Sequence, residues 1–338
     1  MTRYAQIRST GLHIPTRRIT NAELDERLGE PVSQWLVDNV GIEARHVMSD
    51  EETTSSMVTA AAQQALRRAG VAAEDVDLII VATDTPDFIS PATSSAVQAK
   101  LEARRAGTFD VNAACAGFVT AMDLAARYLA TEPSMQHVLV CGGYAMTRFL
   151  DWSDKKTATL FADGAAAVLL GAGDEPGFLG GRLRADGRYY DALGIYTGGA
   201  ARPATAANVA EHGPPHVEFV RKFPSTFNAE RWPALIDDLL RRSQLSREDL
   251  DLLVFTQLNA RTIEQVMDIL ELDRQRTHMV MDKWGYLGSA CIPAALHDAL
   301  GAGKRPPAGG HVLLCATGGG LAMGGSIWRI TDSLAPSD

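Results

Sequence analysis

The stretch "EDVDLIIVAT" (residues 74–83) recurs later in the chain as "EDLDLLVFTQ" (248–257). A second pair, "HVLVCGG" (137–143) and "HVLLCATGG" (311–319), follows the first pair at matching spacing. Near-continuous Val, Ile and Leu runs are typical of strands that are buried on both faces. The repeated order predicts two similar halves stacked on each other and not a solenoid of many short repeats.

Between the members of each pair lies a segment in which a strand turns through small residues into a helix. These segments are "FDVNAACAGFVTAMDLA" (109–125) and "MVMDKWGYLGSACIPAALHDAL" (279–300). Alternating buried strands and helices predict an α/β protein with helix-covered, largely parallel sheets. The turn-rich "GAGDEPG" (171–177) divides the halves, which we place at 1–172 and 173–338. The aperiodic segment 186–216 is expected to be a functional loop near the site entrance.

Bulk properties exclude several classes of function. The 338 residues carry a net charge of −9, which argues against nucleic acid or an anionic membrane as the main partner. No apolar run approaches the length of a membrane span, and the start does not resemble a signal peptide, so we expect a soluble, cytoplasmic protein. The four cysteines lack metal-ligand spacing, and neither disulfides nor a bound metal is expected.

Cys115 falls where the predicted strand of 109–125 passes into its helix. The unpaired N–H groups and the positive dipole at a helix start favour a thiolate, and small neighbours leave room for a substrate. A free cysteine is equally at home as a small buried hydrophobe. Position alone leaves the nucleophile and the packing residue as open alternatives.

Five motifs together resemble the β-ketoacyl-acyl carrier protein synthase III family of the thiolase superfamily. They occur in family order, and they are "DVNAACAGF" (110–118), "DWSDKKTATLFADGAAAVLL" (151–170), "DLLVFTQLNAR" (251–261), "MDKWGYLGSACIP" (281–293) and "TGGGLAMGGS" (317–326). The resemblance implies the thiolase fold, a five-layered αβαβα sandwich of two duplicated halves. It makes Cys115 the nucleophile that takes up an acyl group as a thioester. It also implies an oxyanion hole formed by the backbone N–H groups of Cys115 and Gly319.

The chain departs from the family at the other two members of the catalytic triad. Thr256 stands where the family has histidine, and Tyr286 stands where it has asparagine. Hydroxyls can still donate hydrogen bonds, but neither residue is an effective general base near pH 7. In the family the histidine and asparagine hold the malonyl carbonyl during decarboxylation. Acyl loading is therefore expected to survive, whereas decarboxylative condensation is in doubt. His297, in the last predicted helix, is an alternative base.

The resemblance also implies where the substrate arm and a second subunit bind. Trp35 matches a tryptophan that stacks on the coenzyme A adenine, and Lys155 replaces an arginine near that nucleotide. Asn259 matches a residue that bonds the pantetheine arm or a site water. Arg261 matches an arginine at the tunnel mouth, and Lys155, Lys156 and Arg148 extend this basic patch towards an acidic carrier protein. Ser90 stands where relatives close the acyl pocket of a homodimer partner with a phenylalanine.

Three functions follow as hypotheses. The first is an acyltransferase that forms acyl-Cys115 from acyl-CoA or acyl carrier protein and passes the acyl group on. The acceptor is malonyl-carrier protein or an oxygen, nitrogen or sulfur nucleophile, and no cofactor is needed. The second is a non-catalytic thiolase-fold partner subunit. The third is an α/β-hydrolase-type thioesterase, because "AACAG" loosely imitates a nucleophile elbow.

Overall fold

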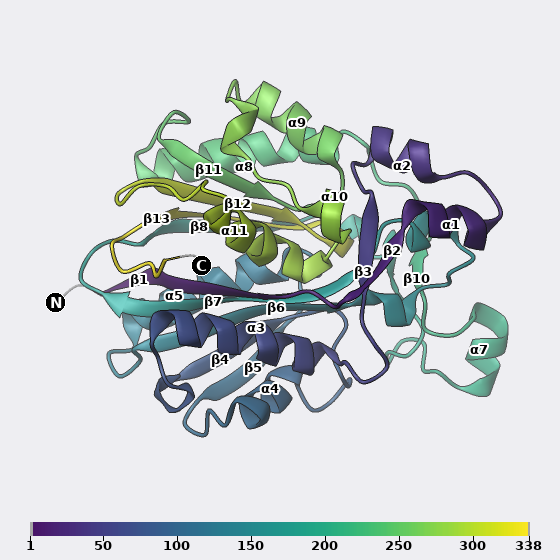
Figure 1. Ribbon diagram of the computed structural model, residues 1–338, viewed down its shortest axis with the longest axis horizontal. Helices are drawn as coiled ribbons and strands as arrows, with labels where there is room; N and C mark the ends of the chain where they lie inside the picture. The colour runs from purple at the N-terminus through teal and green to yellow at the C-terminus, as the bar shows by residue number, and fades with distance from the viewer. Residues whose placement is uncertain (1–2, 337–338) are drawn as a thin grey trace.

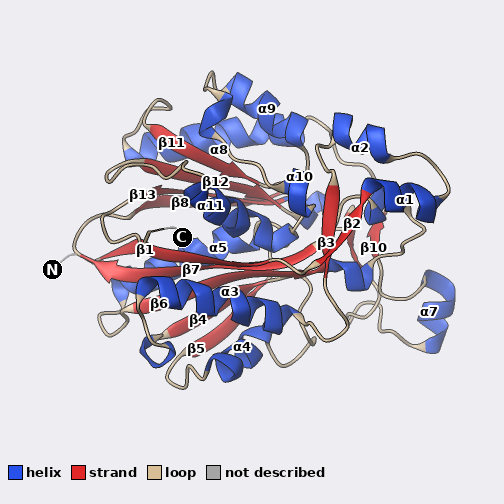
Figure 2. Ribbon diagram, viewed as in Figure 1, coloured by secondary structure: helices blue, strands red, loops and turns tan. Residues whose placement is uncertain are grey.

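Two mixed β-sheets form the framework of the protein, for which the computed structural model describes residues 3–336. The first has the strand order β1 (Tyr4–His13), β7 (Asp163–Gly173), β6 (His137–Ala145), β4 (Leu78–Ala82), β5 (Gly107–Val111). The second has the order β11 (Leu250–Phe255), β12 (His311–Thr317), β13 (Ala322–Arg329), β8 (Phe178–Ala185). Figure 2 shows the two sheets stacked with helices above, between and below them.

The two sheets repeat one pattern of strand directions. In the first sheet β4 is parallel to β6, which is antiparallel to β7, which is antiparallel to β1. In the second sheet β11 is parallel to β12, which is antiparallel to β13, which is antiparallel to β8. The strands that begin in the repeated sequences, β4 with β11 and β6 with β12, therefore hold equivalent places. The duplication predicted from the sequence is present in the fold.

The expected strand near residue 279 is the point where the halves differ. β5 is a full strand beside β4, whereas its counterpart beside β11 is reduced to an isolated parallel bridge between Leu253 and Thr277. A side chain takes over the pairing there: the buried Gln257 amide donates to the Phe255 and His278 carbonyls and accepts from Val280 N–H at 2.8 Å. The short helix α10 (Met281–Trp284) then replaces the predicted extended run.

Helices complete five layers (Figure 1). The central helices α5 (Gly117–Thr131) and α11 (Cys291–Gly301) lie between the sheets, and each contacts strands of both. Their alanine-rich sequences fit this place, because small side chains let two sheets approach one helix. On the outer faces lie α3 (Thr54–Ala69) and α4 (Thr93–Leu101) on one side, and α8 (Phe227–Ser243) and α9 (Ala260–Ile269) on the other.

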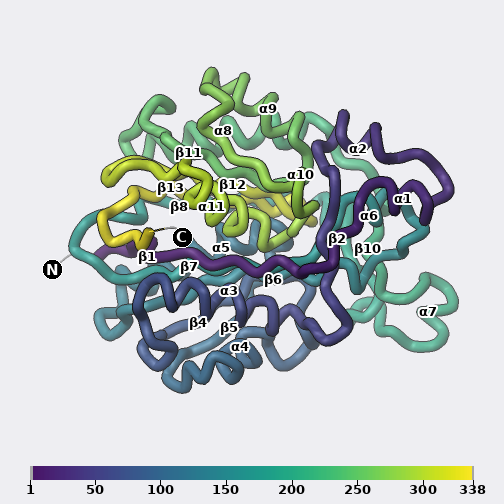
Figure 3. The backbone as a smooth tube through the Cα atoms, in the orientation of Figure 1, coloured from purple at the N-terminus to yellow at the C-terminus, as the bar shows by residue number. Residues whose placement is uncertain are grey.

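The remaining elements gather at one end of the sandwich, opposite the marked N-terminus in Figure 3. They are the hairpin β2 (Arg17–Thr20) and β3 (Ala44–Val47), the pair β9 (Leu193–Ile195) and β10 (Val217–Phe219), and the helices α1 (Asn21–Leu28), α2 (Ser33–Asn39), α6 (Lys155–Ala158) and α7 (Ala206–His212). Within residues 3–336, no helix is long and apolar enough to cross a membrane.

The halves meet backbone against backbone at the centre of the molecule. A Cβ atom added to Gly142 on β6 would lie 2.5 Å from the Ser289 carbonyl oxygen and 2.9 Å from Ala290 Cα. The Ser289 hydroxyl also donates to the Gly143 carbonyl at 2.9 Å. Only glycine permits this approach, because the neighbouring backbone atoms cannot move aside as a flexible side chain would.

Gly142→Ala is therefore expected to lower the free energy of unfolding by about 1–3 kcal/mol, the usual effect of overpacking a dense core. Gly187→Ala is the matched control, because a Cβ there would meet nothing within 4 Å. Urea unfolding of both variants measures the difference. Equal stability of the two would show that the halves are not in close contact at Gly142.

Candidate active site

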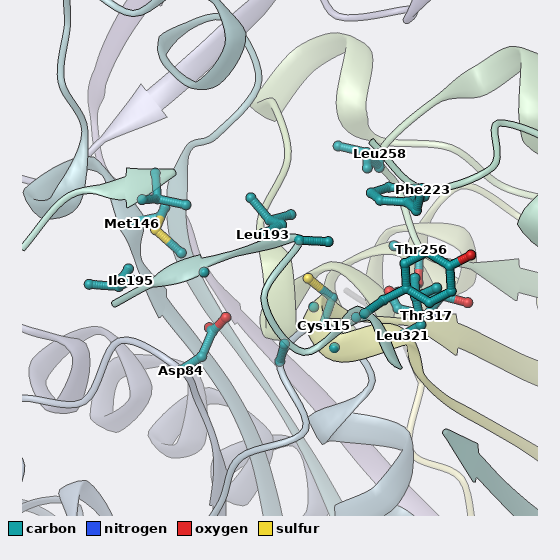
Figure 4. Close-up of a pocket in the computed structure, with 18 of the residues that line it drawn as sticks. Asp84, Cys115, Met146, Leu193, Ile195, Phe223, Thr256, Leu258, Thr317 and Leu321 are labelled. Atoms are coloured by element: carbon teal, nitrogen blue, oxygen red, sulfur yellow. Dashed lines mark hydrogen bonds between the residues drawn. The ribbon is translucent and has the colours of Figure 1, made fainter. Parts of the chain in front are cut away.

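The candidate site forms where three parallel strands end. β5 and β6 both run parallel to β4, so the chain leaves all three strands at one edge of the sheet. Asp84 follows β4, Cys115 follows β5 and Met146 follows β6. Figure 4 shows these three side chains directed towards a common cavity. The carboxyl ends of parallel strands are the usual location of binding sites in such sheets.

A strained turn presents the Cys115 thiol. Ala114 has φ +46°, a left-handed conformation that alanine seldom adopts, and its N–H donates to Asn112 Oδ1 at 3.0 Å. Gly117 N–H donates back to the Ala114 carbonyl at 2.8 Å, and α5 begins there. The packing therefore imposes a backbone strain of the kind that is found at functional sites.

The cavity has a volume of about 320 Å³ and collects residues that are far apart in the sequence. Cys115, Thr256, Tyr286 and Gly319 all line it, as does Thr317. Tyr189, Tyr190 and Leu193–Ile195 also line it, so the aperiodic segment 186–216 does reach the site as expected. No histidine in residues 3–336 contributes to the lining.

The electrostatic environment of Cys115 differs from the one expected for a helix start. Burial is the largest influence, and it raises the pKa of the thiol well above its ordinary value. The charge of Asp84 and the nearby Cys291 raise that pKa further, whereas a hydrogen bond with the Tyr286 side chain lowers it. Desolvation of the thiolate outweighs the favourable helix end. The Cys115 side chain is therefore a thiol at rest, and Tyr286 is the side chain that lowers its pKa.

The backbone and the ring of Tyr286 are both fixed. Its N–H donates to the Leu160 carbonyl at 3.0 Å, and its carbonyl accepts from Ala162 N–H at 3.0 Å. The ring packs against Phe161 and Tyr144, with centroids 5.8 and 6.3 Å away. These contacts leave the Tyr286 hydroxyl little freedom to turn away from Cys115.

Thr256 is engaged with the neighbouring strand. Its hydroxyl accepts from Thr317 N–H at 2.9 Å and makes a longer contact of 3.4 Å to the Thr317 carbonyl. Trp232 Nε1 in turn donates to Thr317 Oγ1 at 2.7 Å. A hydroxyl carries one proton, and the contact of Thr256 with the Thr317 carbonyl is long for an O–H···O hydrogen bond. The backbone N–H of Thr317 fixes the position of the Thr256 oxygen at the edge of the cavity.

The glycine run 318–320 closes the cavity beside the nucleophile. A Cβ on Gly318 would lie 2.6 Å from both Cys115 N and the Ala113 carbonyl oxygen, and Gly320 has φ +71°. The backbone of this loop therefore lies against the Cys115 turn. A Cβ on Gly319 would lie 3.6 Å from Ala114 Cβ, so Gly319 also lies beside this turn.

Two polar groups that line the cavity were missed by the sequence analysis. Asp84 and Asn228 each have a buried Oδ1 atom without a hydrogen-bond partner in the described part of the chain. Burial raises the pKa of the Asp84 carboxyl to about 6. The position of Asp84 directly after a buried parallel strand was a usable signal. Asn228 lies at the start of the amphipathic helix α8, where its sequence context gives no such signal.

A groove of about 750 Å³ lies next to the cavity and contains two of the predicted substrate-binding residues. Trp35 lines it with 59% of its surface exposed, and Lys155 lines it while paired with Glu30 at 2.9 Å. Lys156, Arg221 and Lys222 add further positive charge. The two spaces are lined by neighbouring residues of the same segments: Leu160 and Phe219 line the groove, and Phe161 and Val217 line the cavity.

The other predicted residues lie outside both linings. Asn259 caps α9 through Thr262 N–H at 3.0 Å and donates to the Asn39 carbonyl at 3.1 Å, while Arg261 is exposed on the same helix. Ser90 is exposed in the loop after β4. Arg148 does not extend the basic patch, because it pairs with Asp50 at 3.0 Å elsewhere.

His297 is not positioned as a base for Cys115. It lies on α11, where its ring contacts the Thr10 hydroxyl at 2.9 Å and the Arg68 guanidinium, and it does not line the cavity. Over residues 3–336, the structure contains no group of three His, Cys, Asp or Glu side chains that could hold a metal ion.

Comparison with known proteins shows similarity to one family along the whole chain. The model of 3-oxoacyl-[acyl-carrier-protein (ACP)] synthase III matches residues 109–187, and that of its C-terminal part matches 240–330. The β-ketoacyl-[acyl-carrier-protein] synthase III of Coxiella burnetii is 35% identical over 97% of this chain and 99% of its own.

Solved structures agree with this similarity. The 3-oxoacyl-[acyl-carrier-protein] synthase III of Aquifex aeolicus superposes with a TM-score of 0.85 at 30% identity, covering 96% of this chain and 99% of its own. The priming β-ketosynthase of the R1128 polyketide biosynthetic pathway gives 0.90 at 28% identity, covering 98% of each chain.

The opposing influences on Cys115 predict opposite effects of two substitutions on alkylation by iodoacetamide at pH 7. Tyr286→Phe removes a contact that favours the thiolate and should slow alkylation roughly tenfold, because a hydrogen bond to a charged group is worth about 1.5–3 kcal/mol. Asp84→Asn removes a nearby negative charge and should accelerate it. Mass spectrometry quantifies the adduct, with Cys115→Ala as background. A shift in the same direction in both variants would contradict this account of the site.

Proposed function

The chain belongs to the 3-oxoacyl-[acyl-carrier-protein] synthase III family, and from this we propose that it is an acyltransferase that carries an acyl group on Cys115 but condenses it poorly with malonyl thioesters. One observation carries the proposal. The Cys115 thiol lines a partly apolar cavity, and a hydrogen bond with the Tyr286 side chain lowers its pKa. Thr256, at the histidine position of the family, accepts a hydrogen bond from the Thr317 N–H of the neighbouring strand.

Loading needs only groups that surround Cys115. The sulfur attacks the thioester carbonyl of acyl-CoA or acyl-carrier protein, and the tetrahedral oxyanion is held by the N–H groups of Cys115 and Gly319. Collapse breaks the bond to the donor thiolate, which takes up the proton released by Cys115. Oxyanion donors are worth about 3 kcal/mol each, and the proximity of the 318–320 loop to the Cys115 turn supports this pair.

Condensation with malonyl thioesters needs two donors for the enolate oxygen. The Thr256 hydroxyl contacts the Thr317 backbone, and the Tyr286 hydroxyl interacts with Cys115 itself. Burial and neighbouring groups hold the pKa of Tyr286 well above its ordinary value, so it stays a neutral phenol. A reactive oxygen, nitrogen or sulfur nucleophile needs no enolate donor and is the acceptor favoured here.

The other two hypotheses receive less support. The duplicated thiolase-type fold excludes the α/β-hydrolase. A non-catalytic partner subunit would not need a thiol held in a strained turn at a cavity. We therefore retain the acyltransferase.

The groove beside the cavity suits the arm of an acyl donor. Trp35 offers an exposed ring for stacking on an adenine, and Lys155, Lys156 and Lys222 offer charge for phosphates or for an acidic carrier protein. Arg261 and Asn259 on α9 extend the proposed contact, and the cytoplasmic pool would supply the donor.

A homodimer is part of this proposal. Phe88 and Ile89, next to Ser90, are 60% and 85% exposed. Side chains of this kind commonly mark a surface that another subunit covers. We expect light scattering to give the mass of two chains at micromolar concentration, and a monomer would contradict the role assigned to Ser90.

The split between loading and condensation is directly measurable. Incubation with acyl-CoA should add one acyl mass to the wild-type protein and none to Cys115→Ala. Decarboxylation of malonyl-CoA or malonyl-carrier protein should be at least about a hundredfold slower than in relatives that keep both donors.

The double variant Thr256→His/Tyr286→Asn, which restores the family residues, should recover decarboxylation. Wild-type condensation at rates typical of ketosynthases would show that the two hydroxyls suffice. Failure of every acyl-CoA to load Cys115 would overturn the proposal.

Trp35→Ala should raise KM for acyl-CoA about tenfold and leave kcat nearly unchanged, because stacking binds the donor without touching the reacting atoms. Val37→Ala is the control, since Val37 is an exposed hydrophobic residue of the same helix that does not line the groove. Steady-state acyl transfer gives both constants. A fall in kcat with constant KM would place Trp35 outside the donor site.

A further inference from the structure

Asp84 is the feature of the cavity that acyl transfer does not use. It follows β4 directly and lines the cavity with Cys115, yet its buried Oδ1 has no hydrogen-bond donor within residues 3–336. Leaving a buried carboxylate oxygen without a donor is unfavourable, and a ligand in the cavity that carries a donor would remove this cost.

The surroundings of Asp84 form one side of the cavity. In Figure 4, Asp84, Met146 and Ile195 lie on one side of Cys115, and Thr256, Thr317 and Leu258 lie on the other. In the function proposed above, the acceptor approaches Cys115 from the side of Thr256. The acyl chain on Cys115 then extends into the other side of the cavity, which Asp84 lines. That side is otherwise lined by apolar residues such as Met146 and Ile195.

We propose that Asp84 selects acyl groups that carry a hydrogen-bond donor, a hydroxyl or an ammonium, on their carbon chain. The inference rests on the proposed function and specifies its substrate class. A plain hydrocarbon chain would cover the carboxylate without bonding to it, whereas a hydroxyl or ammonium would satisfy it. Sites built around a buried polar group reject analogues that lack the matching group far more strongly than apolar pockets distinguish chain lengths.

The protonation state of Asp84 agrees with this role. Because its pKa is raised to about 6, the carboxyl is mainly ionised above neutral pH and accepts hydrogen bonds. The groups that interact with it electrically are Cys115 and Tyr144, whose own pKa values are raised, so both are neutral there. The negative charge therefore has no cation beside it within the site until a ligand supplies one.

The test compares the rates at which butyryl-CoA, 3-hydroxybutyryl-CoA and 3-aminobutyryl-CoA, with their 4-substituted isomers, acylate Cys115, followed by intact mass. The wild type should load at least one substituted chain ten times faster than butyryl. Asp84→Leu should lose this preference and load the butyryl group faster. Comparing the hydroxyl with the amino substrates shows which of the two hydrogen-bond donors Asp84 prefers. Asp174→Asn, which removes an exposed carboxylate in a distant loop, is the matched control.

Thermal unfolding adds a second readout. Asp84→Leu should unfold at the same or a higher temperature than the wild type, because it removes an unsatisfied buried charge, whereas a structural role would lower that temperature. Equal or faster loading of butyryl by the wild type would overturn this inference and leave the acyltransferase standing. Absence of any acyl adduct on a thiol that iodoacetamide still modifies would overturn both.

Discussion

The contact between the two halves at Gly142 and Ser289 determines the geometry of the site. Backbone lies against backbone there, and Tyr286 stands three residues before Ser289 in the same short loop. Cys115 comes from the first half, and Tyr286, which lowers the pKa of its thiol, comes from the second. The distance between these two side chains therefore depends on how closely the halves pack.

Thr256 and Tyr286 both line the cavity of Cys115, and both are fixed by contacts outside it. The Tyr286 ring joins an aromatic cluster with Phe161 and Tyr144, and the Thr256 hydroxyl ties the ends of β11 and β12 together. Both side chains are therefore integrated into the surrounding packing.

Much of the fold followed from sequence because it depends on local patterns. Repeated buried strands, small residues around Cys115 and the aperiodic segment 186–216 each carry their signal within a few neighbours. Features that depend on tertiary contacts did not follow. The missing strand near 279 depends on the Gln257 side chain bonding to the distant backbone groups of His278 and Val280, and the raised pKa of Cys115 depends on burial. Arg148 pairs with Asp50, which follows the β2–β3 hairpin, and no sequence motif indicates that contact.

In the groove, Glu30 competes with any anionic ligand for Lys155, because the two side chains form an ion pair. Glu30 neutralises part of the positive field that an anionic arm would meet, so binding exchanges an internal carboxylate for an external anion. Added salt screens the attraction between an anionic ligand and the basic side chains. It also weakens the Lys155–Glu30 pair, which the ligand must break. These two effects oppose each other, so the binding of an anion in the groove is expected to depend less on ionic strength than the number of basic side chains implies.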